Sequence, residues 1–223
     1  MLPKQVWAMP KLGTFNLHAS LLPDYRGAAP INWAIINGET QTGVTTFFIN
    51  ENIDTGAIIK QETTEISESM TTGELHDILM KLGSKTVVET VEMIEKGNID
   101  PLKQKEGDFN PAPKLNKDNC RIQWDQPLEK IYNQIRGLNP YPGAWTILKS
   151  NGEEIELKIY KVNMVLEEHK ISPGIVLISK KQLRVAAQNG FLDITDLKMS
   201  GKKRMDAISL LNGYTFHEGC NMF

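Results

Sequence analysis

The feature that most constrains the fold is a change of sequence pattern near the middle of the chain. Up to about residue 97 the chain mixes strand-like and helix-like periodicities. Residues 98–118 then carry Pro, Gly, Asn and Asp at irregular intervals and show no period. From residue 119 onward, short apolar segments recur at regular spacing. We therefore expect two domains, 1–97 and 119–223, joined by a linker over 98–118.

The first domain reads as α/β. Apolar and polar residues alternate over 14–20, which predicts a strand with two different faces. A loop and a short helix starting at Pro30 follow. Further elements are predicted as strands over 44–49 and 57–60 and as a long helix over 72–96, where Thr71 and Glu74 have capping-box spacing.

The second domain reads as mainly β. A short helix is predicted over 128–137, and another near 205–211. Between them, the pairs Asn151-Gly152 and Asn189-Gly190 are typical of hairpin turns. Five short strands are expected, at 145–148, 155–162, 174–178, 183–187 and 191–197. Evenly spaced short strands of this kind favour a small barrel or sandwich.

Charge and cysteine content narrow the functional classes. Residues 1–119 hold 11 basic and 16 acidic side chains, whereas residues 120–223 hold 14 and 11. A basic second half suits a phosphate-bearing partner, although ordinary surface variation explains the same asymmetry. Cys120 and Cys220 have no metal-ligand spacing and are interpreted as free thiols of a cytoplasmic protein. The chain has no apolar run long enough for a membrane span, and 1–13 does not read as a signal peptide.

Three residues form the candidate catalytic group. Asn16 and His18 lie two positions apart on one predicted strand, so their side chains share a face. Asp54 follows a second strand, and in open parallel sheets reactive groups gather at such strand ends. An amide can stabilise an oxyanion, a histidine can take a proton from an attacking amine, and an aspartate can orient the imidazole. No metal or nucleophilic side chain is needed for that chemistry.

The alternative is that the three residues never meet, as is usual for such a trio chosen from a chain of this size. The other histidines are better explained as surface or packing residues. They are His76 on the long helix, and His169 and His217 in loop-like settings.

The segment Phe15-Asn16-Leu17-His18-Ala19-Ser20-Leu21-Leu22-Pro23, followed by Tyr25-Arg26-Gly27-Ala28-Ala29-Pro30, resembles the signature of the folate-dependent formyltransferases. Gly43-Val44-Thr45 and Asp54-Thr55-Gly56 stand where that family has its second motif. The resemblance implies a Rossmann-like catalytic domain and 10-formyltetrahydrofolate as formyl donor. It also implies that Asn16, His18 and Asp54 are catalytic. The folate site would be walled by the loop Ser20, Leu21, Leu22 and Pro23.

The second half resembles the branch of this family that acts on methionyl-tRNA. The segments that carry this resemblance are Ala112–Leu115, Ile135–Trp145, Gly201–Met205 and Leu211–Gly213. It implies formylation of the methionyl α-amine on initiator tRNA, in translation initiation, and a small OB-like β-barrel domain that holds the tRNA. Basic residues are carried over as tRNA contacts, namely Lys114, Arg136, Lys202, Lys203 and Arg204. The alternative for 202–204 is an ordinary solvated turn.

The resemblance begins inside the family's catalytic domain. It implies that about ninety residues, which form the first part of the Rossmann-like sheet in relatives, have no counterpart before Met1. We therefore expect a monomer when the domain is complete. A parallel sheet without those strands would expose an edge and favour self-association. Asp24 departs from the family, which often has a basic residue there.

Three other functions remain open at this stage. The chain could formylate an amino sugar nucleotide, could hydrolyse the formyl-folate, or could be an inactive tRNA-binding remnant. The motifs Gly201–Met205 and Leu211–Gly213 favour the tRNA enzyme over the sugar enzyme. Hydrolysis would leave the basic half without an acceptor, and a remnant would bind tRNA but not folate.

Overall fold

A computed structural model describes residues 3–217 and 219–223; residues 1 and 2 of the first predicted domain and residue 218 of the second lie outside this description. The chain divides into two compact units. The first unit comprises residues 1–34 and 39–114, and the second comprises residues 35–38 and 115–223. Each unit is described below by itself.

The amino-terminal elements include those predicted from the sequence, together with three short ones that were not. They are α1 (Lys4–Trp7), β1 (Phe15–His18), β2 (Arg26–Gly27), α2 (Pro30–Ile36), β3 (Gln41–Phe48), β4 (Ile58–Glu65), α3 (Thr72–Glu95) and β5 (Pro111–Ala112). The predicted capping box at the start of α3 is confirmed, because Thr71 and Glu74 satisfy each other's backbone N–H groups. The elements α1, β2 and β5 have four residues or fewer, too few to show a period.

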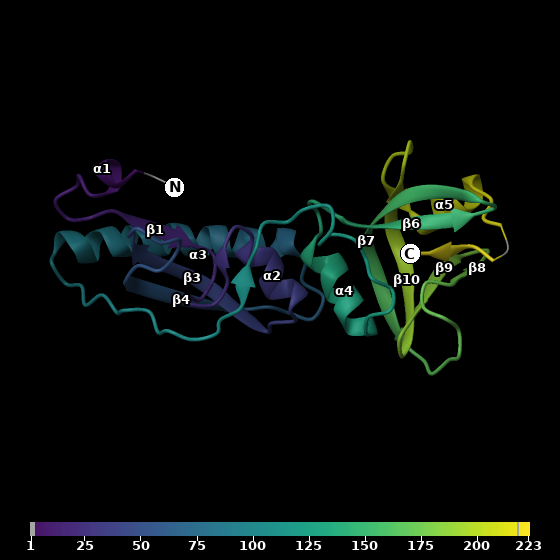
Figure 1. Cartoon of the computed structure of the whole chain (residues 1–223), viewed down its shortest axis with the longest axis horizontal. Coiled ribbons are helices and arrows are strands. Elements are labelled where there is room, and N and C mark those ends of the chain that lie inside the picture. The colour runs from purple at the N-terminus through teal and green to yellow at the C-terminus, as the bar shows by residue number, and fades with distance from the viewer. Residues whose placement is uncertain (1–2, 218) are drawn as a thin grey trace. The chain divides into compact units, whose positions relative to one another are not determined.

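The three longer strands form a sheet in the order β1-β3-β4, and both pairings are antiparallel. The expectation of a parallel sheet is therefore wrong for these strands. Strands β3 and β4 pair antiparallel because the connection between them is short, whereas two parallel neighbouring strands need a longer crossover connection. Helix α3 packs on β3 and β4 (Figure 1), and its buried residues include Leu75 and Leu79.

The polar side chains at the carboxyl end of β1 and just beyond it are buried rather than solvated. His18 and Ser20 are 6% and 0% exposed, whereas Asn16 on the same face is exposed. A face that buries polar groups must supply hydrogen-bond partners for them. The alternating pattern therefore predicted the position of the strand correctly. The structure differs in burying polar side chains of this segment, which need hydrogen-bond partners.

The second unit is built on a seven-stranded antiparallel sheet. Its strands are β6 (Ala144–Ser150), β7 (Glu153–Leu166), β8 (Val176–Ser179), β9 (Gln182–Ala187), β10 (Gly190–Met199), β11 (Met205–Asp206) and β12 (Asn221–Met222). The main path runs β12-β6-β7-β10-β9-β8, with β11 on β10. A bridge between Ile175 and Asn221 links the two ends of this path, so the sheet is nearly closed like a barrel.

Helices α4 (Leu128–Gly137) and α5 (Ala207–Gly213) pack on this sheet (Figure 1). The core of this unit is apolar and includes Ile131 of α4, Leu157 of β7 and Leu192 of β10. The turn pairs predicted from the sequence are confirmed, because Asn151, Gly152 and Asn189 all have positive φ between neighbouring strands. Strands β11 and β12, each of two residues, were not predicted.

Candidate active site

His18 ends strand β1 and is held by the backbone of the loop that follows. Its Nε2 atom lies 2.8 Å from the carbonyl oxygen of Tyr25. A carbonyl oxygen can only accept a hydrogen bond, so Nε2 carries the proton. In neutral His18 the lone pair is therefore on Nδ1. The carbonyl of Tyr25 fixes both the orientation of the ring and the nitrogen that can take up a proton.

Asp54 lies on the same side as this free nitrogen. Its Oδ2 atom is 3.8 Å from His18 Nδ1, and both side chains are largely buried. This distance is too long for a hydrogen bond but lies within the range of an ion pair with a protonated ring. The Tyr25 carbonyl supplies the hydrogen bond to the ring, and the predicted role of Asp54 in orienting the imidazole stays a prediction. Asp54 faces the nitrogen that would become charged.

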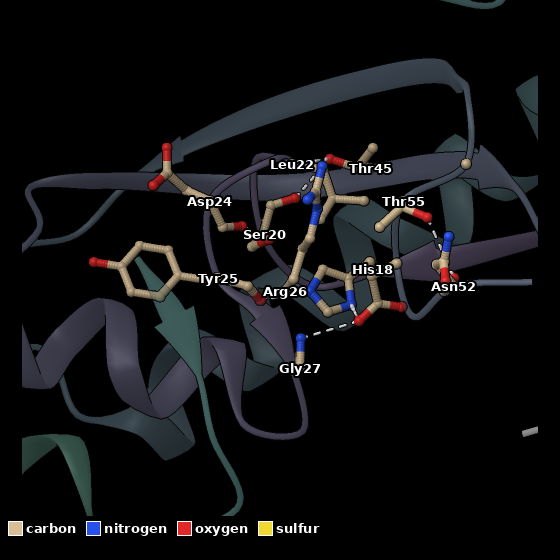
Figure 2. A network of polar contacts seen from close by, with 12 residues as sticks. His18, Ser20, Leu22, Asp24, Tyr25, Arg26, Gly27, Thr45, Asn52 and Thr55 are labelled. Atoms are coloured by element: carbon tan, nitrogen blue, oxygen red, sulfur yellow. Dashed lines mark hydrogen bonds and ion pairs between the residues drawn. The ribbon is translucent and has the colours of Figure 1, made fainter. Parts of the chain in front are cut away.

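The Asp54 carboxylate is itself held by the backbone. Gly27 N donates to Asp54 Oδ2 at 3.0 Å, and Asp54 has a φ of 54° in the turn after β3. Asn50 organises this turn by accepting hydrogen bonds from Asn52 N and the Thr55 hydroxyl. Figure 2 shows His18 and Gly27 together with Asn52 and Thr55 of this turn. The second motif seen in the sequence is therefore a turn that presents one carboxylate to His18.

Asn16 lines a cavity of about 470 Å³ that Asp54 also lines. Most of its exposed surface is apolar and comes from residues such as Trp7, Phe47 and Ile49, while Lys4 and Glu51 are among its polar residues. Mostly apolar pockets with a few polar groups at one end are typical small-molecule sites. No side-chain hydrogen bond of Asn16 is found within the described residues, and its exposed amide faces this cavity.

The loop Ser20, Leu21, Leu22 and Pro23 is anchored by Thr45 of β3. The Thr45 hydroxyl donates to Ser20 O at 2.7 Å and accepts from Leu22 N at 3.1 Å. Ser20 and Leu22 are buried, whereas Leu21 and Pro23 are half-buried. None of the four lines the cavity beside Asn16 in the described part of the chain. Their role in folate binding stays a prediction, and only Leu21 and Pro23 present side-chain surface for it.

Gln104 belongs to the site, although the sequence placed it in the linker. Its side chain is buried and donates to the backbone carbonyls of Asp54 and Gly56, each at 2.9 Å. Arg26 Nε donates to Gln104 Oε1 at 3.0 Å. Gln104 thus ties the Asp54 turn to the loop after His18. An isolated glutamine in an irregular segment carries no local signal, so sequence reasoning missed it.

Two glycines allow the close backbone approaches that this arrangement needs. A Cβ atom added at Gly56 would lie 1.6 Å from the carbonyl oxygen of Phe48, and one at Gly27 would lie 2.4 Å from that of Ala112. Gly27 also pairs with Ala112 in the short parallel β2–β5 ladder. The glycines in the recognised motifs are therefore explained by contact distances rather than by chain flexibility.

The basic residues predicted to contact tRNA lie in different environments. Lys114 and Lys203 are exposed. Lys202 Nζ lies 5.5 Å from the ring centre of Tyr214. Arg204 forms a two-pronged ion pair with Asp196, and this hydrogen bonding raises the pKa of its guanidinium. Arg204 keeps its charge, but a carboxylate already neutralises much of its field.

Arg136 does not fit the prediction of a direct phosphate contact. Its side chain is only 7% exposed, and its Nε donates to Asn133 Oδ1 at 2.8 Å. Burial lowers the pKa of this guanidinium below its ordinary value. Helix α4 turns this side chain inward, so only a small part of its surface is open to a phosphate group.

Three further structural facts bear on the chemistry. Burial raises the pKa of both thiols, Cys120 and Cys220, which disfavours the reactive thiolate. Within residues 3–217 and 219–223, no group of three His, Cys, Asp or Glu side chains is placed to hold a metal ion. None of the helices described is long and apolar enough to cross a membrane.

Comparison with known protein families assigns both parts of the chain. The family described as "Formyl transferase" matches residues 1–91, and the family described as "Formyl transferase, C-terminal domain" matches residues 114–215. Among solved structures, an N-formyltransferase from Helicobacter canadensis, in complex with folinic acid and dTDP-3-aminofucose, is 25% identical with a TM-score of 0.64. The match covers 81% of this chain and 64% of that one. HypX from Aquifex aeolicus, in complex with tetrahydrofolic acid, is also 25% identical, with a TM-score of 0.67 over 94% of this chain and 36% of that one.

Curated sequences give a nearer match. Methionyl-tRNA formyltransferase of Flavobacterium johnsoniae is 52% identical over 224 residues, covering 100% of this chain and 71% of that protein. The enzyme of the same name from Bacteroides thetaiotaomicron is 47% identical over 228 residues, with 100% and 71% covered. The chain therefore belongs to the methionyl-tRNA formyltransferase family.

Proposed function

We propose that this chain transfers the formyl group of 10-formyltetrahydrofolate to the α-amino group of methionyl-tRNA, as a step of translation initiation in the cytoplasm. The observation that carries this proposal is identity of about half over the whole chain to enzymes of that name. The arrangement of His18 and Asp54 supports it, because the free ring nitrogen and the carboxylate face each other across 3.8 Å.

His18 acts as the general base in this proposal. As the amine attacks the formyl carbon, its nitrogen must lose a proton, and His18 Nδ1 offers the lone pair that accepts it. The Tyr25 carbonyl keeps the opposite nitrogen protonated throughout. Asp54 then faces the newly formed imidazolium and stabilises its charge. The proton passes finally to the folate nitrogen that leaves, which balances the transfer.

Asn16 is proposed to stabilise the oxygen of the formyl group. Side chains two apart on a strand lie about 7 Å apart along one face, so Asn16 and His18 can contact opposite sides of one reacting carbon. The amide of Asn16 would donate to the oxygen as negative charge develops on it. The amine itself is the nucleophile, in agreement with the buried thiols of Cys120 and Cys220.

The formyl donor is a substrate that supplies an activated one-carbon group. The cavity lined by Asn16, Phe47 and Ile49 suits a flat aromatic ring, because most of its exposed surface is apolar while Asn16 and Asp54 are among its polar lining residues. We propose that the donor lies here, with its formyl group towards Asn16. Leu21 and Pro23 are the members of the predicted folate loop that can add apolar surface.

The domain organisation completes the proposal. We propose that 1–97 is part of a Rossmann-like formyltransferase catalytic domain, that 98–118 is a linker, and that 119–223 is an OB-like barrel that binds the tRNA. Supporting this, the second unit is a nearly closed antiparallel sheet. Its proposed phosphate contacts are Lys202, Lys203 and Arg204, to which the exposed Lys114 is added.

The test is a formyl-transfer assay with purified protein, 10-formyltetrahydrofolate and either methionyl-tRNA or an amino sugar nucleotide, with the product identified by mass spectrometry. We expect formyl-methionyl-tRNA from the first acceptor only. Product from the sugar nucleotide alone would replace this proposal with the sugar enzyme, to which the structural relation is more distant. Free formate without either product would indicate hydrolysis, and tRNA binding without folate binding would indicate an inactive remnant.

His18→Ala should lower kcat by about 10²–10⁴-fold, the range typical of a lost general base. Binding of tRNA should stay unchanged, because His18 is buried in the first unit. The matched control is His76→Ala, which removes an exposed histidine from α3. Wild-type transfer rates in the His18 variant would remove this residue from the mechanism.

A further inference from the structure

The outer face of strands β6, β7 and β10 carries aromatic and basic side chains around a hollow of about 340 Å³. Trp145 of β6 is opposite Lys158 of β7, and Lys158 is opposite Lys198 of β10. Residues directly opposite one another in neighbouring strands point to the same face of a sheet. These three side chains therefore form one row across the outside of the barrel, and Trp145 and Lys158 line the hollow.

Tyr141 stands at the rim of this hollow and is 81% exposed. The loop that carries it is anchored on both sides. Lys158 Nζ donates to Pro142 O at 2.9 Å, and Gly143 N donates to Leu138 O at 2.9 Å. An aromatic ring of this size normally avoids water. A rigid loop that holds such a ring in solvent presents a flat surface for a partner.

The ring of Trp145, unlike that of Tyr141, is not open to stacking by a partner. Lys117 Nζ lies 4.8 Å from its centre and the Arg121 guanidinium carbon lies 5.3 Å from it, while its Nε1 donates to Lys117 O. Trp145 is also nearly buried. It forms the floor of the hollow and holds cations there, and Tyr141 is the exposed ring.

Two carboxylates on this side of the sheet already have cationic partners. Glu156 is 3.2 Å from Lys117, and Asp196 is paired with Arg204. Lys158 donates to a neutral carbonyl, and Lys198 is exposed. The hollow therefore has excess positive charge beside an exposed aromatic ring. The same face continues to the proposed tRNA contacts, since Tyr160 lies next to Gly143 and the Arg204 guanidinium lies 4.0 Å from the Tyr160 ring.

We infer that this hollow binds an unpaired nucleotide of the tRNA, with the base stacked on Tyr141 and its phosphates beside Lys158 and Lys198. The inference rests on the proposed function for its partner. Base faces are accessible only where a nucleotide is unpaired, and sites for such nucleotides combine an exposed aromatic ring with a basic groove. A duplex would contact the lysines but could not use the tyrosine.

The test measures binding of the full chain to two fluorescent probes, a short single-stranded RNA and an RNA duplex of the same length. Tyr141→Ala should raise the Kd for the single strand about tenfold, because stacking on one base contributes that much. The Kd for the duplex should stay within about twofold. Tyr141→Phe, which keeps the ring, should bind as wild type does, and Leu166→Ala is the control for loss of another exposed apolar side chain.

Lys198→Ala should weaken binding of both probes and reduce the slope of log Kd against log salt by about one. Lys180→Ala, at an exposed lysine in the β8–β9 turn, is the matched control and should leave the slope unchanged. A cross-link from a 4-thiouridine probe should map to the peptide that contains Tyr141. The inference would be overturned if Tyr141→Ala left the affinity for the single strand unchanged. It would also be overturned if Tyr141→Ala lowered the affinities for the single strand and the duplex equally.

The same samples are assayed for formyl transfer, which separates this inference from the proposed function. If the wild type transfers the formyl group and Tyr141→Ala binds the single strand as tightly as the wild type does, the nucleotide site is rejected and the proposed function is supported. Selective loss of single-strand binding in a protein that transfers no formyl group would keep the site and remove the proposed reaction.

Discussion

At the scale of single residues, the candidate site depends on backbone groups more than on side-chain pairs. The His18 ring is oriented by the Tyr25 carbonyl, and the Asp54 carboxylate by the Gly27 N–H. Backbone groups are held by the whole fold and cannot change rotamer. This arrangement favours a precise position for the two reacting side chains, which matters because an error of about 1 Å can cost 10²-fold in rate.

Thr45 is the residue whose replacement tests this dependence. Its hydroxyl bonds Ser20 O, Leu22 N and Gln61 Nε2. Thr45→Val keeps the shape but removes the hydroxyl that bonds Ser20 O and Leu22 N, while Gln61 Nε2 keeps its hydrogen bond to Leu22 O. We expect the free energy of unfolding to fall by about 1–3 kcal/mol, measured by urea denaturation.

Formyl transfer by Thr45→Val should fall as well, because the loop between His18 and Tyr25 loses its anchor on β3. Thr63→Val, at an exposed position of β4, serves as the control and should change stability by less than about 0.5 kcal/mol. Equal stability of the two variants would show that Thr45 does not anchor the loop.

At the scale of elements, helix α3 supports the sheet that carries the site. It packs on β3 and β4, the strands that flank the Asp54 turn and of which β3 supplies Thr45, and its buried residues include Leu75 and Leu79. Near its carboxyl half, the hydroxyl of Thr90 contacts that of Thr46 on β3 at 2.9 Å. A helix with exposed faces gains part of its stability from its capping groups.

Thr71→Ala should therefore lower the free energy of unfolding by about 1 kcal/mol, since it removes the hydroxyl that accepts the Glu74 N–H. Thermal unfolding followed by circular dichroism measures this loss. Ser84→Ala, at an exposed site inside α3, is the control and should be neutral or slightly stabilising. A Thr71→Ser variant should recover most of the loss, and failure to do so would argue against the capping role.

At the scale of the whole molecule, the two units use different kinds of core. The first unit buries polar residues such as His18, Ser20 and Thr45 beside its site. The second unit closes its sheet around an apolar core that includes Leu157, Leu183 and Leu192. The first unit holds the proposed catalytic groups in place, whereas the second supports the surface proposed to bind RNA.

Leu192→Ala tests the core of the second unit. The residue is fully buried, so its truncation should cost about 2–5 kcal/mol through lost transfer energy and a cavity. Hydrogen exchange should show reduced protection in β7, β9 and β10. Leu166→Ala, 82% exposed at the end of β7, should change stability little. A similar cost for both variants would show that the apolar core is not what stabilises this sheet.

The sequence by itself determined the elements that have a clear apolar periodicity or that begin or end at a characteristic cap or turn residue. The helix at 72–95, the helix at 128–137 and the hairpin pairs at Asn151 and Asn189 agree with their predicted positions. Their signals are local, because helical stripes, caps and positive-φ turns depend on neighbours in the chain. Asn16, His18 and Asp54 were also nominated from local pattern and resemblance.

Only the tertiary structure decided which nitrogen of His18 is free, that Gln104 supports the Asp54 turn, and that Arg136 points inward. It also decided the antiparallel order β1-β3-β4. Each of these facts depends on contacts between residues far apart in sequence, for which no local period exists. The physical reason is that burial and hydrogen-bond partners are properties of the packed chain, whereas propensity and spacing are properties of the segment.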